Sequence, residues 1–271
     1  MQQQDAERIM NCLRRLALQA GAAIMEVYVR ADIAVQHKAD ASPLTEADEA
    51  ADRLISAGLQ AEFPDIAVVT EEQAQSHNLQ AERFFIVDPL DGTKEFVKKN
   101  GEFTVNVALI EAGRPVFGVV HAPALDVTYW GQAGQGAWKQ TGGADPEPIA
   151  VAPVPQGSSG WRVVGSRSHQ SEAFQVFLER LPEAEIVAMG SSLKLCLVAE
   201  GAADLYPRLG LTSEWDTGAA QAVVEAAGGQ VLEYPSLQPL RYNTRPETLL
   251  NPHFIVCARP SEVWAAGTSA S

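Results

Sequence analysis

Cysteine is scarce in this chain of 271 residues, which contains only Cys12, Cys196 and Cys257. Because these cysteines are odd in number and far apart in the sequence, they fit neither a disulfide framework nor a zinc site, and they favour a reducing compartment. The sequence also lacks any run of about 18 uncharged apolar residues, so we expect no membrane-spanning helix. The N-terminal segment MQQQDAERIM lacks the charged start and apolar run of a signal peptide. We therefore expect a cytoplasmic protein.

Positive charge is also in short supply. The chain has 34 acidic residues against 20 lysines and arginines, a formal net charge of −14 at pH 7, and its basic residues form no cluster. Such a chain has no long-range attraction for nucleic acid or for an anionic membrane surface. We expect no nucleic-acid partner and no stable membrane insertion, and the composition does not support peripheral association with the inner membrane. If the protein binds an anion, it needs a few well-placed cations or metal ions.

The first part of the chain has helix patterns followed by strand patterns. Residues 5–29 and the segment after Thr45 have apolar residues at spacings of three and four, which is typical of amphipathic helices. Strand patterns follow at residues 66–70, 84–87 and 103–110. The third strand pattern runs through a turn into another apolar stretch, which indicates a β-hairpin.

A change of composition separates this part from the rest of the chain. Residues 141–148 and 152–160 are rich in proline, glycine and serine and favour loop or linker. After residue 160, strand and helix patterns alternate. We therefore expect an α/β protein with an N-terminal α+β domain over residues 1–155 and a C-terminal α/β domain over residues 156–271.

Carboxylates lie at the borders of apolar segments at three places. In FFIVDPLDGTKEF, residues 84–96, a strand pattern leads directly into Asp88 and Asp91, although an Asp-Gly turn is an equally good interpretation of this stretch alone. Glu71 follows the strand pattern VVT, where an acid usually marks a solvated strand end. Asp216 lies near the start of a helix pattern, where an acid usually caps the helix.

Taken together, these acids indicate a metal site. Carboxylates gathered in one cleft would repel each other and raise each other's pKa, and divalent cations would relieve that repulsion. An all-oxygen ligand set without cysteine or histidine favours Mg²⁺ over zinc or copper. Sites with two or more Mg²⁺ ions suit phosphoryl chemistry. Gly92 and Thr93 would then present backbone N–H groups to a phosphate.

Three motifs, in their order and spacing, resemble the inositol monophosphatase superfamily of Mg²⁺-dependent, lithium-sensitive phosphomonoesterases: TEE at 70–72, DPLDGT at 88–93 and WDTGAA at 215–220. Within that superfamily, DPLDGTKEF, NGEFTVNVALI, GSRSH, GSSLKLCLVAEG and LYPR resemble 3'(2'),5'-bisphosphate nucleotidases of the CysQ type. The resemblance covers nearly the whole chain. It implies a layered αβαβα sandwich with the site between the two domains, two or three Mg²⁺ ions in each site, and inhibition by Li⁺.

The resemblance assigns the metal ligands residue by residue. It implies that Glu71, Asp88 and the backbone carbonyl of Leu90 hold one ion. It implies that Asp88, Asp91 and Asp216 hold a second ion, and that a third, weaker ion binds near Glu71.

The resemblance also implies a catalytic pair. Asp48, in the stretch TEAD, would pair with the hydroxyl of Thr93 and take a proton from the attacking water. The spacing of Thr45 and Asp48 is also typical of a capping box with Asp at the position of Glu or Gln. Both roles are compatible, because a carboxylate has two oxygens.

The remaining site residues would bind substrate. From the sequence alone each has an ordinary interpretation, such as a helix cap, a solvated lysine or a surface ion pair. The resemblance instead implies contacts from Gly92, Thr93, Ser168, His169, Gly190, Ser191, Lys194 and Arg208.

The resemblance implies removal of the 3'-phosphate of adenosine 3',5'-bisphosphate, giving AMP and phosphate. 3'-Phosphoadenylyl sulfate is a further candidate substrate, and the cellular role would be nucleotide recycling in sulfur assimilation. Hydrolysis of inositol monophosphate or fructose 1,6-bisphosphate is the first alternative. A non-catalytic sensor of metal or nucleotide is a weaker one. The sequence leaves the oligomeric state open between monomer and dimer.

Overall fold

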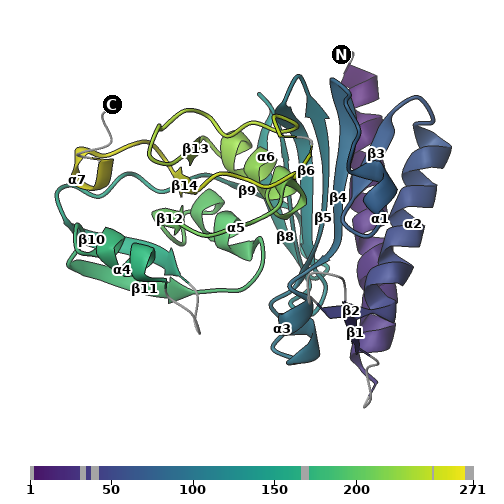
Figure 1. Cartoon of the computed structure of the whole chain (residues 1–271), viewed down its shortest axis with the longest axis horizontal. Helices are drawn as coiled ribbons and strands as arrows, with labels where there is room; N and C mark the ends of the chain where they lie inside the picture. The colour runs from purple at the N-terminus through teal and green to yellow at the C-terminus, as the bar shows by residue number, and fades with distance from the viewer. Residues whose placement is uncertain (1–2, 31–34, 38–42, 166–170, 246, 266–271) are drawn as a thin grey trace.

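The computed structural model describes residues 3–30, 35–37, 43–165, 171–245 and 247–265. Ser168 and His169 lie outside these described residues. The described elements stack as alternating layers of helix and sheet, two helical layers flanking each sheet (Figure 1). The expected αβαβα sandwich is therefore confirmed. Among the described residues, no helix combines the length and the apolar character needed to cross a membrane.

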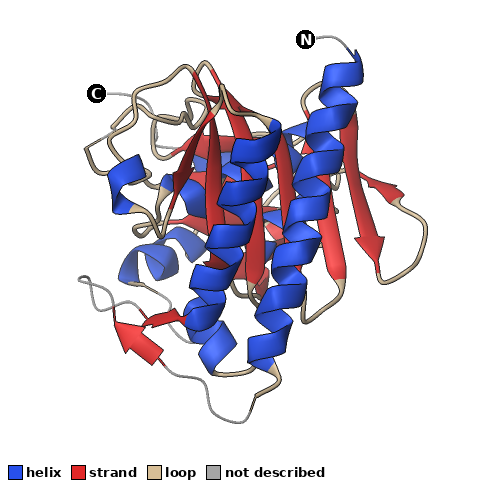
Figure 2. Ribbon diagram, turned by 90° about the vertical axis from the view of Figure 1, so that its right-hand side faces the viewer, coloured by secondary structure: helices blue, strands red, loops and turns tan. Residues whose placement is uncertain are grey.

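The first layer consists of two long helices, α1 (Gln3–Tyr28) and α2 (Glu46–Glu62), which lie side by side on the large sheet (Figure 2). Both confirm the helix patterns of the sequence. The buried face of α1 includes Leu13, Leu16 and Ile24, at the spacing expected for one side of a helix. Thr45 is the N-cap of α2, as expected. A short ribbon that the sequence analysis missed, β1 (Val35–His37) paired with β2 (Pro43–Thr45), precedes α2.

The second layer is a seven-stranded sheet in sequential order. Its strands are β3 (Ala67–Thr70), β4 (Arg83–Asp91), β5 (Thr104–Glu111), β6 (Arg114–Ala122), β7 (Val127–Gln132), β8 (Gly136–Thr141) and β9 (Glu147–Ile149). Only the β3–β4 pair is parallel, and the expected β5–β6 hairpin is present. The expectation of loop over 141–148 was wrong at its end, because β9 pairs with β8 at the sheet edge. The edge strand β9 tolerates Pro148, because only one side of an edge strand needs backbone N–H groups for hydrogen bonds to a neighbouring strand.

Strand β4 positions the candidate site. It does not end at residue 87 but continues to Asp91. Asp88 is paired with Asn106 of β5, and Asp91 is paired with Thr104, so three steps along β4 match two steps along β5. This is the signature of a β-bulge, in which one extra residue is inserted into one strand. After the bulge, Gly92 adopts a left-handed conformation (φ 91°) and begins the short helix α3 (Thr93–Val97).

The middle layer lies between the two sheets. It consists of α5 (Leu193–Ala199) and α6 (Gly218–Ala226), whose apolar residues form one core with the inner faces of both sheets. Two short 3₁₀ helices connect to the site, namely η1 (Ala74–Ser76) after β3 and η2 (Glu214–Asp216) before α6. Because α6 packs on β5, β6 and β7, the segment that carries Asp216 is held against the large sheet.

The second sheet and the last helices complete the fold. The strand order is β11 (Glu183–Ala188), β10 (Ser159–Gly165), β12 (Leu205–Arg208), β14 (Phe254–Cys257) and β13 (Gln230–Glu233). Strands β10, β11 and β12 are parallel, whereas β13 and β14 are antiparallel to their neighbours. Helices α4 (Glu172–Leu178) and α7 (Glu262–Ala265) cover the outer face through Phe174, Phe177 and Trp264.

Candidate active site

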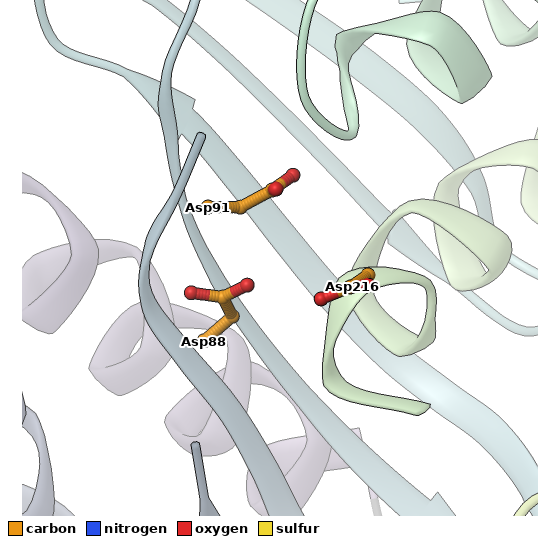
Figure 3. Close-up of side chains that lie close together, drawn as sticks. All are labelled: Asp88, Asp91 and Asp216. Carbon is orange, nitrogen blue, oxygen red and sulfur yellow. The ribbon is translucent and has the colours of Figure 1, made fainter. Parts of the chain in front are cut away.

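Three aspartates meet where β4 ends. Asp88 and Asp91 come from β4 and Asp216 comes from η2, and one carboxylate oxygen of each lies within 4.8 Å of the others (Figure 3). Asp88 is buried, and the other two are half-buried. A simple turn at Asp88 and Asp91, the alternative interpretation of the sequence, does not describe this arrangement. Both side chains point toward Asp216, which belongs to the other half of the chain (Figure 3).

Glu71 joins this group from the neighbouring strand. Thr70 of β3 is paired with Val87 of β4, and the backbone N–H of Glu71 donates to the Val87 carbonyl at 3.2 Å. The residue after each paired position is an acid, so Glu71 lies beside Asp88, and its charge adds to the effect of burial in raising the pKa of Asp88. The structure thus brings together all four carboxylates that the sequence suggested.

The charges of this cluster are poorly tolerated without a counter-ion. Burial raises the pKa of Asp88 well above its ordinary value, and the neighbouring carboxylates raise it further. Burial raises the pKa of Asp91 to about 6, against the opposing effect of the Lys194 ammonium. Burial and then the Asp91 carboxylate raise the pKa of Asp216 to about 8. A hard divalent cation bound by oxygen atoms would remove this repulsion, so the donor set fits Mg²⁺.

Backbone N–H groups hold each aspartate in place. One oxygen of each carboxylate accepts a hydrogen bond from the main chain, which fixes its direction. The bonds are Leu90 N to Asp88 Oδ1 at 3.1 Å, Ser192 N to Asp91 Oδ2 at 2.6 Å and Ser213 N to Asp216 Oδ2 at 2.9 Å. Since each aspartate uses only one oxygen in this way, the second oxygen remains for a cation.

Asp48 and Thr93 form the expected pair. Asp48 is buried at the start of α2, and the Thr93 hydroxyl donates to its Oδ1 at 3.2 Å. The other oxygen, Oδ2, accepts from the backbone N–H of Thr45 at 2.8 Å and from the Thr45 hydroxyl at 2.6 Å. The contacts expected of Asp48, to Thr93 and within the cap of α2, are therefore both present, one on each oxygen. The Thr93 hydroxyl also approaches the Leu90 carbonyl at 3.4 Å.

A pocket of about 430 Å³ opens from the aspartates toward the second sheet. Gly190 and Ser191 line it just before α5, Lys194 lines it from the first turn of α5, and Arg208 lines it at the end of β12. Asp91, Gly92 and Asp216 also line the pocket. All candidate substrate-binding residues in the described part of the chain, except Thr93, therefore line the same pocket.

A buried polar array behind the aspartates was not predicted. The Ser192 hydroxyl donates to Asn106 Oδ1 at 2.8 Å, and the Thr104 hydroxyl lies 2.8 Å from that of Ser192 and 3.0 Å from that of Ser191. Asn106 and Thr104 are the β5 partners of Asp88 and Asp91. The array therefore ties the start of α5 to the strand beside the acids. The alternation of Thr and Asn in the apolar run FTVNVALI was the only signal for it.

A second unpredicted contact joins the segments that carry Glu71 and Asp216. The His77 ring lies 4.9 Å from the ring of Trp215, and its Nε2 lies 2.9 Å from the Thr70 carbonyl oxygen. Because a carbonyl only accepts hydrogen bonds, Nε2 must carry the proton. His77 thus fixes the loop after Glu71 against η2.

Comparison with known proteins identifies the family. The sequence model of the inositol monophosphatase family matches residues 5–268, almost the entire chain. The chain belongs to the inositol monophosphatase family. CysQ of Escherichia coli K12, named a 3'(2'),5'-bisphosphate nucleotidase, is 46% identical over 246 residues, which cover 89% of this chain and 96% of that protein. The protein of the same name from Haemophilus influenzae is 32% identical and covers 95% of this chain and 96% of its own.

Solved structures of inositol monophosphatase family members agree with the fold. A crystal structure of CysQ from Bacteroides thetaiotaomicron, at 37% identity, superposes with a TM-score of 0.80 and covers 93% of this chain and 98% of that one. An inositol monophosphatase from Thermotoga maritima, at 28% identity, gives a TM-score of 0.73 and covers 90% of this chain and 89% of that one. The layered architecture is therefore that of the family.

Proposed function

We propose that this chain is a phosphatase that hydrolyses the 3'-phosphate ester of adenosine 3',5'-bisphosphate to AMP and inorganic phosphate. The observation that carries the proposal is the meeting of the aspartate cluster with the Asp48–Thr93 pair at the end of a polar pocket. The name of the relatives, which cover 89% of this chain at 46% identity, supports a bisphosphate nucleotide as the substrate. 3'-Phosphoadenylyl sulfate shares the reacting group and would be a second substrate, consistent with a cytoplasmic role in sulfur assimilation.

The aspartate cluster would hold two or three Mg²⁺ ions. Asp88, Asp91 and Asp216 would share the ions with Glu71 and with the Leu90 carbonyl. When bound, the metal would neutralise phosphate charge and make water more acidic. Li⁺ would compete for one of these positions and inhibit turnover. A backbone N–H holds one oxygen of each aspartate, and this hydrogen bond would orient the other oxygen toward the ion.

The Asp48–Thr93 pair would handle the proton. Thr45 holds one oxygen of Asp48, so the other is directed at the Thr93 hydroxyl. The Thr93 hydroxyl would accept a proton from the attacking water while it passes its own proton to Asp48 Oδ1. The water oxygen forms the new bond to phosphorus, the bond to the ribose 3'-oxygen breaks, and that oxygen takes up a proton from solvent.

Residues 1–155 would supply most of this chemistry, and residues 156–271 would supply Asp216 and the contacts to the nucleotide. Gly190, Ser191, Lys194 and Arg208 would contact the nucleotide, since all four line the pocket beside the acids. Ser168 and His169 lie outside the described residues, and their substrate contacts stay a prediction.

A panel of phosphate esters tests the proposed substrate. We expect adenosine 3',5'-bisphosphate to have a kcat/KM at least about tenfold above that of inositol 1-phosphate or fructose 1,6-bisphosphate. Phosphate release with Mg²⁺ measures it. A higher kcat/KM for either alternative substrate would refute the nucleotide assignment, and absence of turnover on every ester would favour the non-catalytic sensor.

Mg²⁺ should also stabilise the folded protein, because it binds a cluster that exists only when both halves of the chain are folded. At a concentration one hundred times its Kd, a ligand of the native state raises the free energy of unfolding by about 2.7 kcal/mol. Urea unfolding in Mg²⁺ and in EDTA, at matched ionic strength, measures the difference. Asp91→Asn should reduce the gain, and a wild-type protein that is equally stable in both buffers would contradict the metal assignment.

A further inference from the structure

Helix α2 contains a second buried acid that has no part in the proposed reaction. Asp52 lies in the middle of this helix and is 5% exposed. Aspartate is a poor helix former, and a buried carboxylate is costly unless hydrogen bonds compensate for the lost water. Asp52 follows Asp48 by four residues, so the two carboxylates lie on the same side of α2. Because Asp48 contacts Thr93, this side of the helix is the one that reaches the candidate active site.

The shortest contact of Asp52 is with Thr70, the last residue of β3. The Thr70 hydroxyl donates to Asp52 Oδ1 at 2.6 Å, and Thr70 is also buried. The side-chain amide of Gln73 donates to Asp52 Oδ2 at 2.8 Å, and the Ser56 hydroxyl approaches Oδ1 at 3.4 Å. The carboxylate therefore joins α2 to the end of β3 and to the loop that follows.

The backbone of Thr70 is held as well as its side chain. Its N–H donates to the Ser76 hydroxyl at 3.1 Å, and its carbonyl oxygen accepts from His77 Nε2 at 2.9 Å. Strand β3 lies at the edge of the large sheet and pairs with β4. An edge strand has a ladder of hydrogen bonds on one side only. The contacts of Thr70 therefore take the place of a second neighbouring strand.

The pleat of β3 links the direction of Thr70 to that of Glu71. Successive side chains of a strand point to opposite faces of the sheet. Val68 packs against the core that includes α1 and α2, whereas Val69 belongs to the core between the two sheets. Thr70 then faces α2, where it meets Asp52, and Glu71 faces the aspartate cluster. A rotation of the strand end that released Thr70 would turn Glu71 away from the cluster.

We propose that Asp52 is a positioning residue for the metal site, because it holds Thr70 and so directs Glu71 toward the Mg²⁺ ions. This inference rests on the proposed function, in which Glu71 is a metal ligand. Asp52 acts from the opposite face of the sheet and touches neither the ion nor the substrate. Helix α2 then serves both parts of the reaction, the proton pair through Asp48 and the metal through Asp52.

Loss of the contact should weaken Mg²⁺ binding. We expect Thr70→Val, which removes the hydroxyl, to raise the Kd for Mg²⁺ about tenfold, as is typical when a residue that supports a metal ligand is lost. Titration calorimetry of the substrate-free protein with Mg²⁺ measures the Kd. In phosphate-release assays, the Mg²⁺ concentration that gives half-maximal rate should rise by the same factor, and saturating Mg²⁺ should recover most of the turnover. Thr70→Ser keeps the hydroxyl and should bind Mg²⁺ like the wild type.

A double variant removes the contact without leaving either polar group unpaired. Asp52→Leu combined with Thr70→Val replaces both partners with apolar side chains of similar shape, a change that can be nearly neutral for folding. The double variant should bind Mg²⁺ about tenfold more weakly than the wild type, and no more weakly than Thr70→Val alone, because both residues act through one contact. Urea unfolding in EDTA verifies that each variant is folded.

A matched control separates the positioning role from a purely structural one. Thr128→Val removes another buried threonine hydroxyl from the large sheet, one that lies 2.9 Å from His121 Nδ1. It should lower stability like Thr70→Val but leave the Kd for Mg²⁺ unchanged. A wild-type Kd in the double variant, or an equal rise of the Kd in Thr128→Val, would overturn the positioning role. A wild-type protein that binds no Mg²⁺ would instead overturn the metal assignment of the proposed function.

Discussion

Asp88→Asn should lower kcat by at least about 1,000-fold while the protein stays folded. Asp88 is the buried centre of the cluster and lies next to Glu71, Asp91 and Asp216. An amide at this position keeps an oxygen for the Leu90 N–H but loses the charge that two ions would share. Phosphate release from adenosine 3',5'-bisphosphate at saturating Mg²⁺ measures the loss.

The stability of this variant distinguishes a functional cluster from a structural one. Burial and repulsion raise the pKa of Asp88, so a neutral side chain should leave the metal-free protein as stable as the wild type or more stable. Urea unfolding in EDTA measures this. Asp145→Asn, at an exposed position, is the matched control and should change neither property. Asp88→Asn with wild-type turnover would rule out the cluster as the reaction centre.

Thr93→Val should lower kcat by about 10²- to 10⁴-fold, the range for loss of a proton-transfer group. Valine has nearly the same shape as threonine and removes only the hydroxyl that donates to Asp48. Stabilisation by Mg²⁺ should be unchanged, because the aspartates keep their positions. Thr93→Ser retains the hydroxyl and should keep most of the activity.

A double mutant tests whether Thr93 and Asp48 act as one unit. Asp48→Asn should cost similar activity and, in addition, about 1 kcal/mol of stability, because Asp48 also accepts from Thr45 in the cap of α2. Combining the two changes should reduce kcat little beyond either alone. Fully multiplicative losses would show that the two residues act separately.

The acids could be predicted because their signal is local. Glu71 and Asp88 lie at the ends of apolar strand patterns, and Asp216 lies at the start of a helix pattern, so each acid marks the border of an element. The same holds for α2, where Thr45 and Asp48 carry the capping pattern in four consecutive residues. The family resemblance then supplied the order of the layers, which periodicity alone could not.

The supporting contacts could not be predicted, because they depend on partners far away in the chain. Ser192 meets Asn106 and Thr104 only after α5 docks on the large sheet. His77 contacts Trp215 only after η2 packs against the large sheet. The strand β9 has a proline and no alternating pattern, and its pairing with β8 depends on the available sheet edge.

Because of the bulge in β4, the candidate site depends on the number of residues in this strand. In a regular strand, residues three apart face opposite sides, so Asp88 and Asp91 could not both point toward Asp216. The inserted residue brings them into phase, and a bulge also leaves one backbone unit outside the ladder. Deleting Leu90 would keep both acids in phase on a regular strand yet remove the carbonyl that we propose as a ligand. A relative that kept every acid but lost one residue here would therefore have an incomplete metal site.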